Sequence, residues 1–154
     1  MKHTLAPPTV EEQIIVFADL AGFHRVICSQ LSPEDTFAFL SDYYAAAQGI
    51  LDGSGGRLVK FIGDAMLIVF PSHAPDRALV TLRTLKAAID ALLVQQRLDS
   101  RLRIKAHVGT VAAGAIGSGE LERFDVCGSA VDQAALLPDG EWVLSDELRK
   151  RTRS

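Results

Sequence analysis

The chain has 154 residues, of which 48% are hydrophobic and 23% charged, and its formal net charge is −3. This length and composition suit one globular domain with a real buried core. The slight negative charge argues against a general nucleic-acid binder, two cysteines are too few for a disulfide scaffold, and no apolar run approaches the ~20 residues of a membrane span. Residues 1–8 lack the apolar segment of a signal peptide, so we expect a cytoplasmic protein.

The first half of the chain predicts a strand, a long helix and a β-hairpin. Ser32 followed by Pro33 is a helix start, because serine caps well and proline suits the first helical position. Gly63-Asp64 is a plausible primed hairpin turn between two apolar runs. We expect a nearly continuous apolar strand over residues 13–19, a helix from Ser32 to Asp52-Gly53, a plain loop at 54–56, and hairpin strands over 58–62 and 65–70.

The second half predicts another long helix followed by strands and short helices. Pro75 opens the helix, and leucine and isoleucine recur along one stripe that we expect in the core. The alternation of elements fits an α+β fold with helices on one face of a mainly antiparallel sheet. We expect a helix from Pro75 to about Gln96, strands over 103–108 and 111–116, a helix over 129–137, a strand over 142–144 and a last helix capped by Ser145.

Two aspartates stand at the ends of these predicted strands. Asp19 closes the first strand, and Asp64 sits in the hairpin turn. If the two strands are neighbours, both carboxylates face one point, which suits Mg²⁺ because that ion takes a few carboxylates and then substrate phosphates. The plain alternative is two acids in surface turns, where acids are common. The spacing alone leaves both interpretations open.

Four blocks of sequence, in order, resemble the catalytic domain of the class III nucleotide cyclases. The resemblance identifies residues 12–154 as a cyclase homology domain that is short at its C-terminus, with residues 1–11 as an N-terminal extension. The blocks are residues 17–23 and 60–65, similar to the two metal motifs, residues 104–117, similar to a Gly-rich strand pair, and residues 123–131, similar to the purine-site segment.

The resemblance implies a ferredoxin-like palm and a two-metal reaction. In the family, the ribose 3′-hydroxyl attacks the α-phosphorus and pyrophosphate leaves. Asp19 and Asp64 are then the ligands of Mg²⁺ or Mn²⁺. We expect His24, where the family often has threonine, to be a surface or half-buried histidine rather than a phosphate contact. The implied triphosphate cradle is the backbone of Leu20, Ala21, Gly22 and Phe23, where Gly22 lets the main chain come close.

The resemblance also implies a choice of base. Lys60 and Asp125 occupy the purine-reading positions, with Lys60 facing ring nitrogens and Asp125 accepting from an exocyclic amine. Adenine offers such an amine, so the pair favours ATP over GTP. The plain alternative is a cross-strand ion pair, and both interpretations can hold before substrate arrives.

Family sites form between two subunits, with the metal acids from one and the purine readers from the other. Both halves are present on this chain. The resemblance therefore implies a head-to-tail, two-fold homodimer, or pairing with a complementary cyclase-like chain.

The helix after the purine segment departs from the family pattern. Active members carry an asparagine that orients the ribose and an arginine that stabilises phosphate charge, at the positions that Asp132 and Leu136 occupy here. Leu136 donates no hydrogen bond, and Asp132 adds a carboxylate beside an anionic substrate. Gln133 could supply an amide only through a one-residue shift, which turns a helical side chain by ~100°.

The C-terminus departs as well, because family domains continue for some tens of residues past residue 148 and bring a phosphate-binding lysine. No sensor domain is visible before the predicted catalytic one. The nearest basic substitutes are Arg149, Lys150, Arg151 and Arg153, for which cations at a helix C-terminus followed by a solvated tail are the simpler interpretation.

Two hypotheses follow. The first is an adenylate cyclase that makes cyclic AMP and pyrophosphate from ATP, slowly or with a partner chain. The second is a catalytically silent cyclase-like domain that binds nucleotide or dimerises in regulation. Asp19 and Asp64 favour the first, while Asp132, Leu136 and the short end favour the second.

Overall fold

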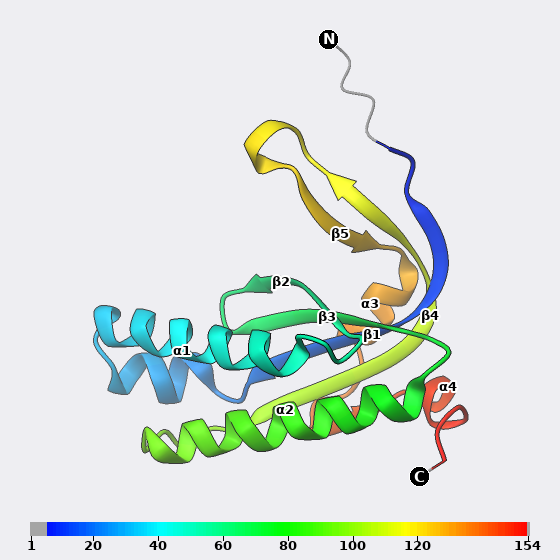
Figure 1. The fold of residues 1–154 in the computed structure, drawn as a ribbon. Coiled ribbons are helices and arrows are strands. Elements are labelled where there is room, and N and C mark those ends of the chain that lie inside the picture. The colour runs from blue at the N-terminus through cyan, green and yellow to red at the C-terminus, as the bar shows by residue number, and fades with distance from the viewer. Residues whose placement is uncertain (1–5, 154) are drawn as a thin grey trace.

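A six-stranded sheet with two long helices on one face forms the body of the protein (Figure 1). The computed structural model describes residues 6–153. The strand order is β2-β3-β1-β4-β5, and β6 pairs with another stretch of β4. The elements are β1 (Thr9–Leu20), a π-helix η1 (Phe23–Cys28), α1 (Pro33–Leu51), β2 (Arg57–Ile62), β3 (Ala65–Pro71), α2 (Pro75–Gln95), β4 (Leu102–Ile116), a 3₁₀ turn η2 (Gly119–Leu121), β5 (Arg123–Cys127), α3 (Ser129–Ala135), β6 (Trp142–Leu144) and α4 (Asp146–Arg149).

The predicted α+β fold is confirmed. All strand pairs are antiparallel except β4 with β6. Ser32 Oγ accepts from Asp35 N–H at 3.1 Å, and Pro33 holds the first position of α1, as the sequence predicts. The hairpin is also confirmed, because β2 and β3 pair down to Ile62 opposite Ala65 across the Gly63-Asp64 turn.

The two faces of β1 lead to two different cores. Strand side chains alternate, so Ile14 and Val16 face α1 and α2 in the main core, while Ile15 and Phe17 face a smaller cluster on the opposite side. Asp19 shares the parity of Ile15 and Phe17. The metal-motif acid is therefore on the face that the long helices leave free.

The prediction of separate strands over 103–108 and 111–116 is wrong, because β4 runs unbroken from Leu102 to Ile116. Its pairing with β1 passes straight through Gly109. This glycine marks a close approach rather than a turn: a Cβ there would lie 2.6 Å from the Cβ of Ala130 on α3. β4 is long because it pairs with β1 on one edge and with β6 and β5 in turn on the other.

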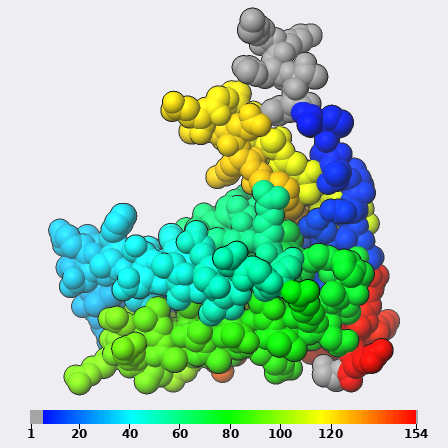
Figure 2. Space-filling view, in the orientation of Figure 1, coloured from blue at the N-terminus to red at the C-terminus, as the bar shows by residue number. Residues whose placement is uncertain are grey.

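The helices are not confined to one face. Ala130 and Ala134 of α3 pack in the smaller cluster with Ile15, on the face opposite α1 and α2. The second half of β4, together with β5, forms an arm that curls away from the helices and projects from the body (Figures 1 and 2). β5 was not predicted as a strand, and α3 is shorter than the predicted helix, with Leu136 as its C-cap.

No helix in residues 6–153 is long and apolar enough to cross a membrane.

Candidate functional site

The two aspartates line one pocket at the end of the sheet. β1 pairs with β3, so the end of β1 and the turn that precedes β3 are neighbours, as the metal interpretation required. A cavity of about 360 Å³ is lined by Asp19, Leu20, Gly22, Phe23, His24, Arg25, Asp64 and Arg103. The structure thus brings together Asp19, Asp64 and the segment expected to cradle phosphates.

Three hydrogen bonds fix the turn that carries Asp64. Its Oδ2 accepts from the N–H of Leu20 at 3.0 Å, which ties the turn to the end of β1. Tyr43 on α1 donates to the carbonyl of Asp64 at 2.9 Å, and Tyr44 donates to the carbonyl of Gly63. Burial, reinforced by the nearby charge of Asp64, raises the pKa of Tyr43. The tyrosine therefore remains a donor to the backbone carbonyl of Asp64.

Arg103 is a site residue that the sequence analysis missed. Its Nε and Nη2 donate to the two carboxylate oxygens of Asp19 at 2.8 and 3.1 Å. The hydrogen bonds that Arg103 donates to Asp19 raise the pKa of Arg103 above its ordinary value. The feature that marks Arg103 as a site residue is the strand register, which places it opposite Asp19 across β1 and β4. That register becomes available only once the strand pairing is known.

The donor set fits Mg²⁺ or Mn²⁺ bound together with a phosphate ligand. Within residues 6–153 no group of three or more His, Cys, Asp or Glu side chains is arranged as a metal cage. A pair of carboxylates is what Mg²⁺ uses when phosphates complete its shell. A carboxylate has about four lone-pair sites, so the two bonds from Arg103 leave Asp19 with capacity for a metal.

The segment after β1 turns sharply at Gly22, which has φ +65°, a conformation that glycine adopts without strain. A π-helix then begins at Phe23. His24 is exposed, lies edge-on to the Phe23 ring and lines the pocket, so it is a surface histidine, while its expected lack of a phosphate contact stays a prediction. The role of this backbone in binding phosphates stays a prediction.

The predicted purine readers form an ion pair, 2.9 Å from Lys60 Nζ to Asp125 Oδ2. The arm brings β5 back over β2, which explains how two distant strands meet. Burial opposes ionisation of Asp125, but hydrogen bonds from Lys60 and the Val126 N–H outweigh it and hold the pKa of Asp125 below its ordinary value. Asp125 is therefore an anionic acceptor at neutral pH. Neither residue lines the pocket of Asp19 and Asp64, so the predicted purine readers and the two aspartates lie apart on this chain.

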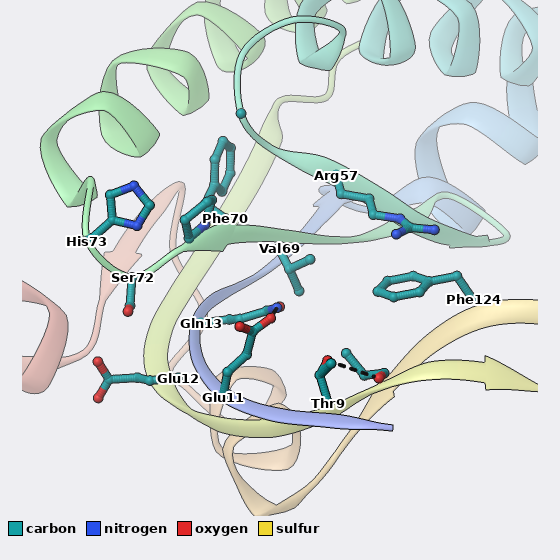
Figure 3. A pocket seen from close by; sticks show the side chains of 13 residues that line it. Thr9, Glu11, Glu12, Gln13, Arg57, Val69, Phe70, Ser72, His73 and Phe124 are labelled. Carbon is teal, nitrogen blue, oxygen red and sulfur yellow. Dashed lines mark hydrogen bonds between the residues drawn. The ribbon is translucent and has the colours of Figure 1, made fainter. Parts of the chain in front are cut away.

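A second cavity, of about 470 Å³, lies between β3 and the arm (Figure 3). Arg57 and Phe124 line it, and the guanidinium of Arg57 lies 3.3 Å from the Phe124 ring centre, but neither Lys60 nor Asp125 is among its lining residues. Its wall on β1 runs from Thr9 to Gln13. Gln13 is six residues from Asp19, roughly 20 Å along a strand, so this cavity is distinct from the pocket of Asp19 and Asp64.

The departures from the family pattern lie on the surface of α3. Asp132 is exposed, and Leu136 is 83% exposed. The amide oxygen of Gln133 accepts from His107 Nε2 at 2.9 Å, while His107 Nδ1 lies 2.8 Å from the Ser145 hydroxyl. Gln133 is thus bound to the sheet, which argues against its replacing the missing asparagine.

The basic C-terminal tail contacts Glu12 and Asp76 and lies away from Asp19 and Asp64. Arg151 pairs with Glu12, and the backbone N–H of Arg153 donates to Asp76. Glu12 is seven residues from Asp19 on β1, roughly 24 Å away. The interpretation of these cations as a tail, rather than as a phosphate site, is the one that this geometry favours.

Comparisons with known proteins agree with this geometry. The sequence profile of the adenylate and guanylate cyclase catalytic domain matches residues 5–139. The chain is 27% identical to atrial natriuretic peptide receptor 2 of Homo sapiens over 159 residues, and 29% identical to an adenylate cyclase of Anabaena cylindrica over 131 residues. A bacterial light-regulated adenylyl cyclase superposes on 97% of the chain with a TM-score of 0.84 at 22% identity, which shows a shared fold.

The match covers only part of each larger protein. The alignments span 98% and 80% of this chain but 15% of the receptor and 26% of the Anabaena cylindrica protein, and the superposition covers 47% of the light-regulated cyclase. The profile, by contrast, spans most of this chain, including both aspartates, Lys60 and Asp125. The chain belongs to the adenylate and guanylate cyclase catalytic domain family.

Proposed function

We propose that this domain converts ATP to cyclic AMP and pyrophosphate. The observation that carries the proposal is the convergence of Asp19 and Asp64 on one pocket, with Arg103 in its wall. The pocket offers two carboxylates for cations, and the guanidinium groups of Arg25 and Arg103 for phosphate oxygens. That combination suits a nucleoside triphosphate bound with divalent metal.

Each group of the chain has a defined task in this proposal. Mg²⁺ or Mn²⁺, held by Asp19 and Asp64, would activate the ribose hydroxyl and neutralise phosphate charge. Arg103 donates to phosphate oxygens once they compete with Asp19 for its two N–H groups. The backbone from Leu20 to Phe23 encloses the phosphates.

Base choice rests on Lys60 and Asp125. An ionised Asp125 accepts from the exocyclic amine of adenine, and the Lys60 ammonium donates to a ring nitrogen. The guanine ring instead presents a carbonyl at the position of that amine, which a carboxylate repels. The ion pair keeps both groups charged and positioned, which supports ATP over GTP within a family that includes guanylate cyclases.

The direct test is a sensitive assay for cyclic nucleotide with Mn²⁺ and either ATP or GTP. We expect slow formation of cyclic AMP from ATP and at least ~10-fold less cyclic GMP, because one mismatched charged hydrogen bond costs about 1.5–3 kcal/mol. Asp125→Ala should bring the ratio of cyclic AMP to cyclic GMP closer to one. Equal rates with ATP and GTP in the wild type would refute the base assignment but not the cyclase activity.

We further propose that the active form is a two-fold homodimer. Each chain holds a metal pocket and a separate purine pair, so two copies placed head to tail complete two composite sites. Within one chain the two half-sites do not share a pocket.

Mixing two inactive variants tests this assembly. Asp64→Ala removes the metal half of one chain, and Asp125→Ala removes the purine half of the other. A mixed dimer then retains one site in which both halves are intact. We expect each variant alone to be nearly inactive and an equal mixture to recover up to about a quarter of the wild-type rate, since about half of the dimers are mixed and each has one good site. Failure of the mixture, with mixed dimers present by native mass spectrometry, would contradict the composite site.

A silent, regulatory domain is the second candidate, and α3 supplies the observation in its favour. Leu136 presents an apolar side chain to solvent where an active site needs a donor, and Asp132 adds negative charge on the same helix. In that case the domain binds nucleotide or dimerises without turnover.

A further inference from the structure

Lys105 is a charged residue next to the metal pocket that the catalytic proposal does not use. It lies on β4 two residues from Arg103, on the same face of the sheet and about 7 Å along the strand. Its side chain is only 16% exposed. A buried lysine stem with its ammonium at a pocket wall is a placement that needs a reason.

Lys105 shares a cavity with Asp19. A pocket of about 110 Å³ is lined by Phe17, Ala18, Asp19, Ala65, Arg103, Lys105 and Ala135. Asp19 and Arg103 also line the larger pocket that contains Asp64. The two cavities therefore adjoin through one ion pair, and Lys105 stands on the other side of that pair from the phosphate-cradle segment.

Asp139 holds the ammonium in its present position. Lys105 Nζ lies 3.2 Å from Asp139 Oδ1 and donates to the carbonyl of Ala135 at 3.4 Å. The Asp139 side chain is 80% exposed, so the ion pair is open to solvent and to competition. After Asp19, whose hydrogen bond is the main cause, Asp139 also raises the pKa of Arg103, which places its charge near both cations.

We propose that Lys105 is a phosphate-binding residue of the metal pocket on its own chain, and that Asp139 restrains it until a nucleoside triphosphate competes for the ammonium. This inference rests on the proposed function, because it names a further contact to the same substrate. Lysine suits the task, since its flexible stem can redirect the charge from an exposed carboxylate to a phosphate. A triphosphate is more anionic than one carboxylate and so competes well.

The alternative is a structural tie from β4 to the loop after α3. The two roles differ in the sign of one effect. In a structural tie, removing either partner loosens the same contact, so both substitutions act in the same direction. For a restrained phosphate ligand, removing Lys105 weakens nucleotide binding, whereas removing the charge of Asp139 strengthens it.

The experiment is calorimetric titration of the full chain with Mn²⁺ and ATP. We expect Lys105→Met to weaken binding about tenfold, the scale of one charge-assisted hydrogen bond. Asp139→Asn should tighten binding about threefold, since an exposed ion pair is worth little. The double variant should bind like Lys105→Met, because Asp139 acts only through the ammonium. The matched control is Lys150→Met, which replaces an exposed lysine at the C-cap of α4 and should leave Mn²⁺–ATP affinity unchanged.

Each remaining outcome is decisive. If the wild type binds Mn²⁺–ATP and Lys105→Met binds it equally well, the phosphate role is wrong while the cyclase proposal stands. If Lys105→Met and Asp139→Asn both weaken binding, the contact is a structural tie. If the wild type does not bind Mn²⁺–ATP, the proposed function fails and this inference fails with it. Thermal melting of each variant checks that affinity changes do not come from unfolding.

Discussion

Asp132→Asn combined with Leu136→Arg is expected to raise cyclic AMP formation at least ~10²-fold over the wild type. Arginine at residue 136 would place donors where phosphate charge develops, and one such electrostatic contact is worth ~10² or more in rate. Asparagine at residue 132 would remove a carboxylate that repels the substrate and supply an amide. A like-charge pair near 4 Å costs on the order of 4 kcal/mol at an effective dielectric of 20, so Asp132→Asn should also contribute to the gain in rate.

The structure indicates that α3 tolerates both changes. Leu136 is 83% exposed at the C-cap of α3, where a cation also interacts well with the helix dipole. Asp132 is exposed, and losing its charge in the first turn costs only about 0.3–1 kcal/mol of helix stability. Folding should therefore not limit the double variant.

Two controls define the result. The gain should disappear when Asp64→Asn is added, because the phosphates then lose a metal ligand. Gln133→Ala should not reproduce the gain, because Gln133 is bound to His107. If the double variant folds, dimerises and binds Mn²⁺–ATP yet makes no more cyclic AMP, these two positions do not limit the rate. The regulatory candidate would then be favoured.

The elements that the sequence predicted well are those specified by local patterns. Ser32-Pro33 fixed the start of α1, and Gly63-Asp64 between two apolar runs fixed the hairpin. β4 was misread because Gly109 in a strand pattern suggests a break. The glycine is instead required by Ala130, a residue 21 positions later, and no local pattern reports such a contact.

The candidate site divides in the same way. Asp19 and Asp64 could be found because each follows an apolar run, and the resemblance added Lys60 and Asp125. Arg103 and Lys105 escaped notice because an arginine and a lysine on a strand are ordinary until register places one opposite Asp19. The ion pair of Lys60 with Asp125 likewise depends on the curl of the arm. Long-range pairing thus carries information that spacing along the chain does not.

The metal assignment predicts that Asp64→Asn and Asp19→Asn differ in their affinity for ATP without metal: the first should leave it unchanged and the second should raise it. Within residues 6–153 Asp64 forms no ion pair, and asparagine keeps an oxygen that can accept from the Leu20 N–H, so Asp64→Asn removes charge with little change in the turn. We expect it to weaken Mn²⁺-dependent ATP binding at least ~10²-fold, the upper scale for disturbing even the outer shell of a metal site. Metal-free binding should stay near the wild-type level.

Asp19→Asn should lose the metal-dependent increment just as fully, yet bind ATP more tightly than the wild type when metal is chelated. The reason is Arg103: its two hydrogen bonds to Asp19 weaken when the carboxylate charge is removed, and the guanidinium then turns to phosphate. Calorimetry in EDTA and in Mn²⁺ measures both effects. Asp42→Asn, an exposed site on α1, controls for the change in net charge. Metal-dependent affinity that survives in Asp64→Asn would remove the metal role. Identical metal-free affinities in the Asp19 and Asp64 variants would show that Arg103 does not respond to Asp19.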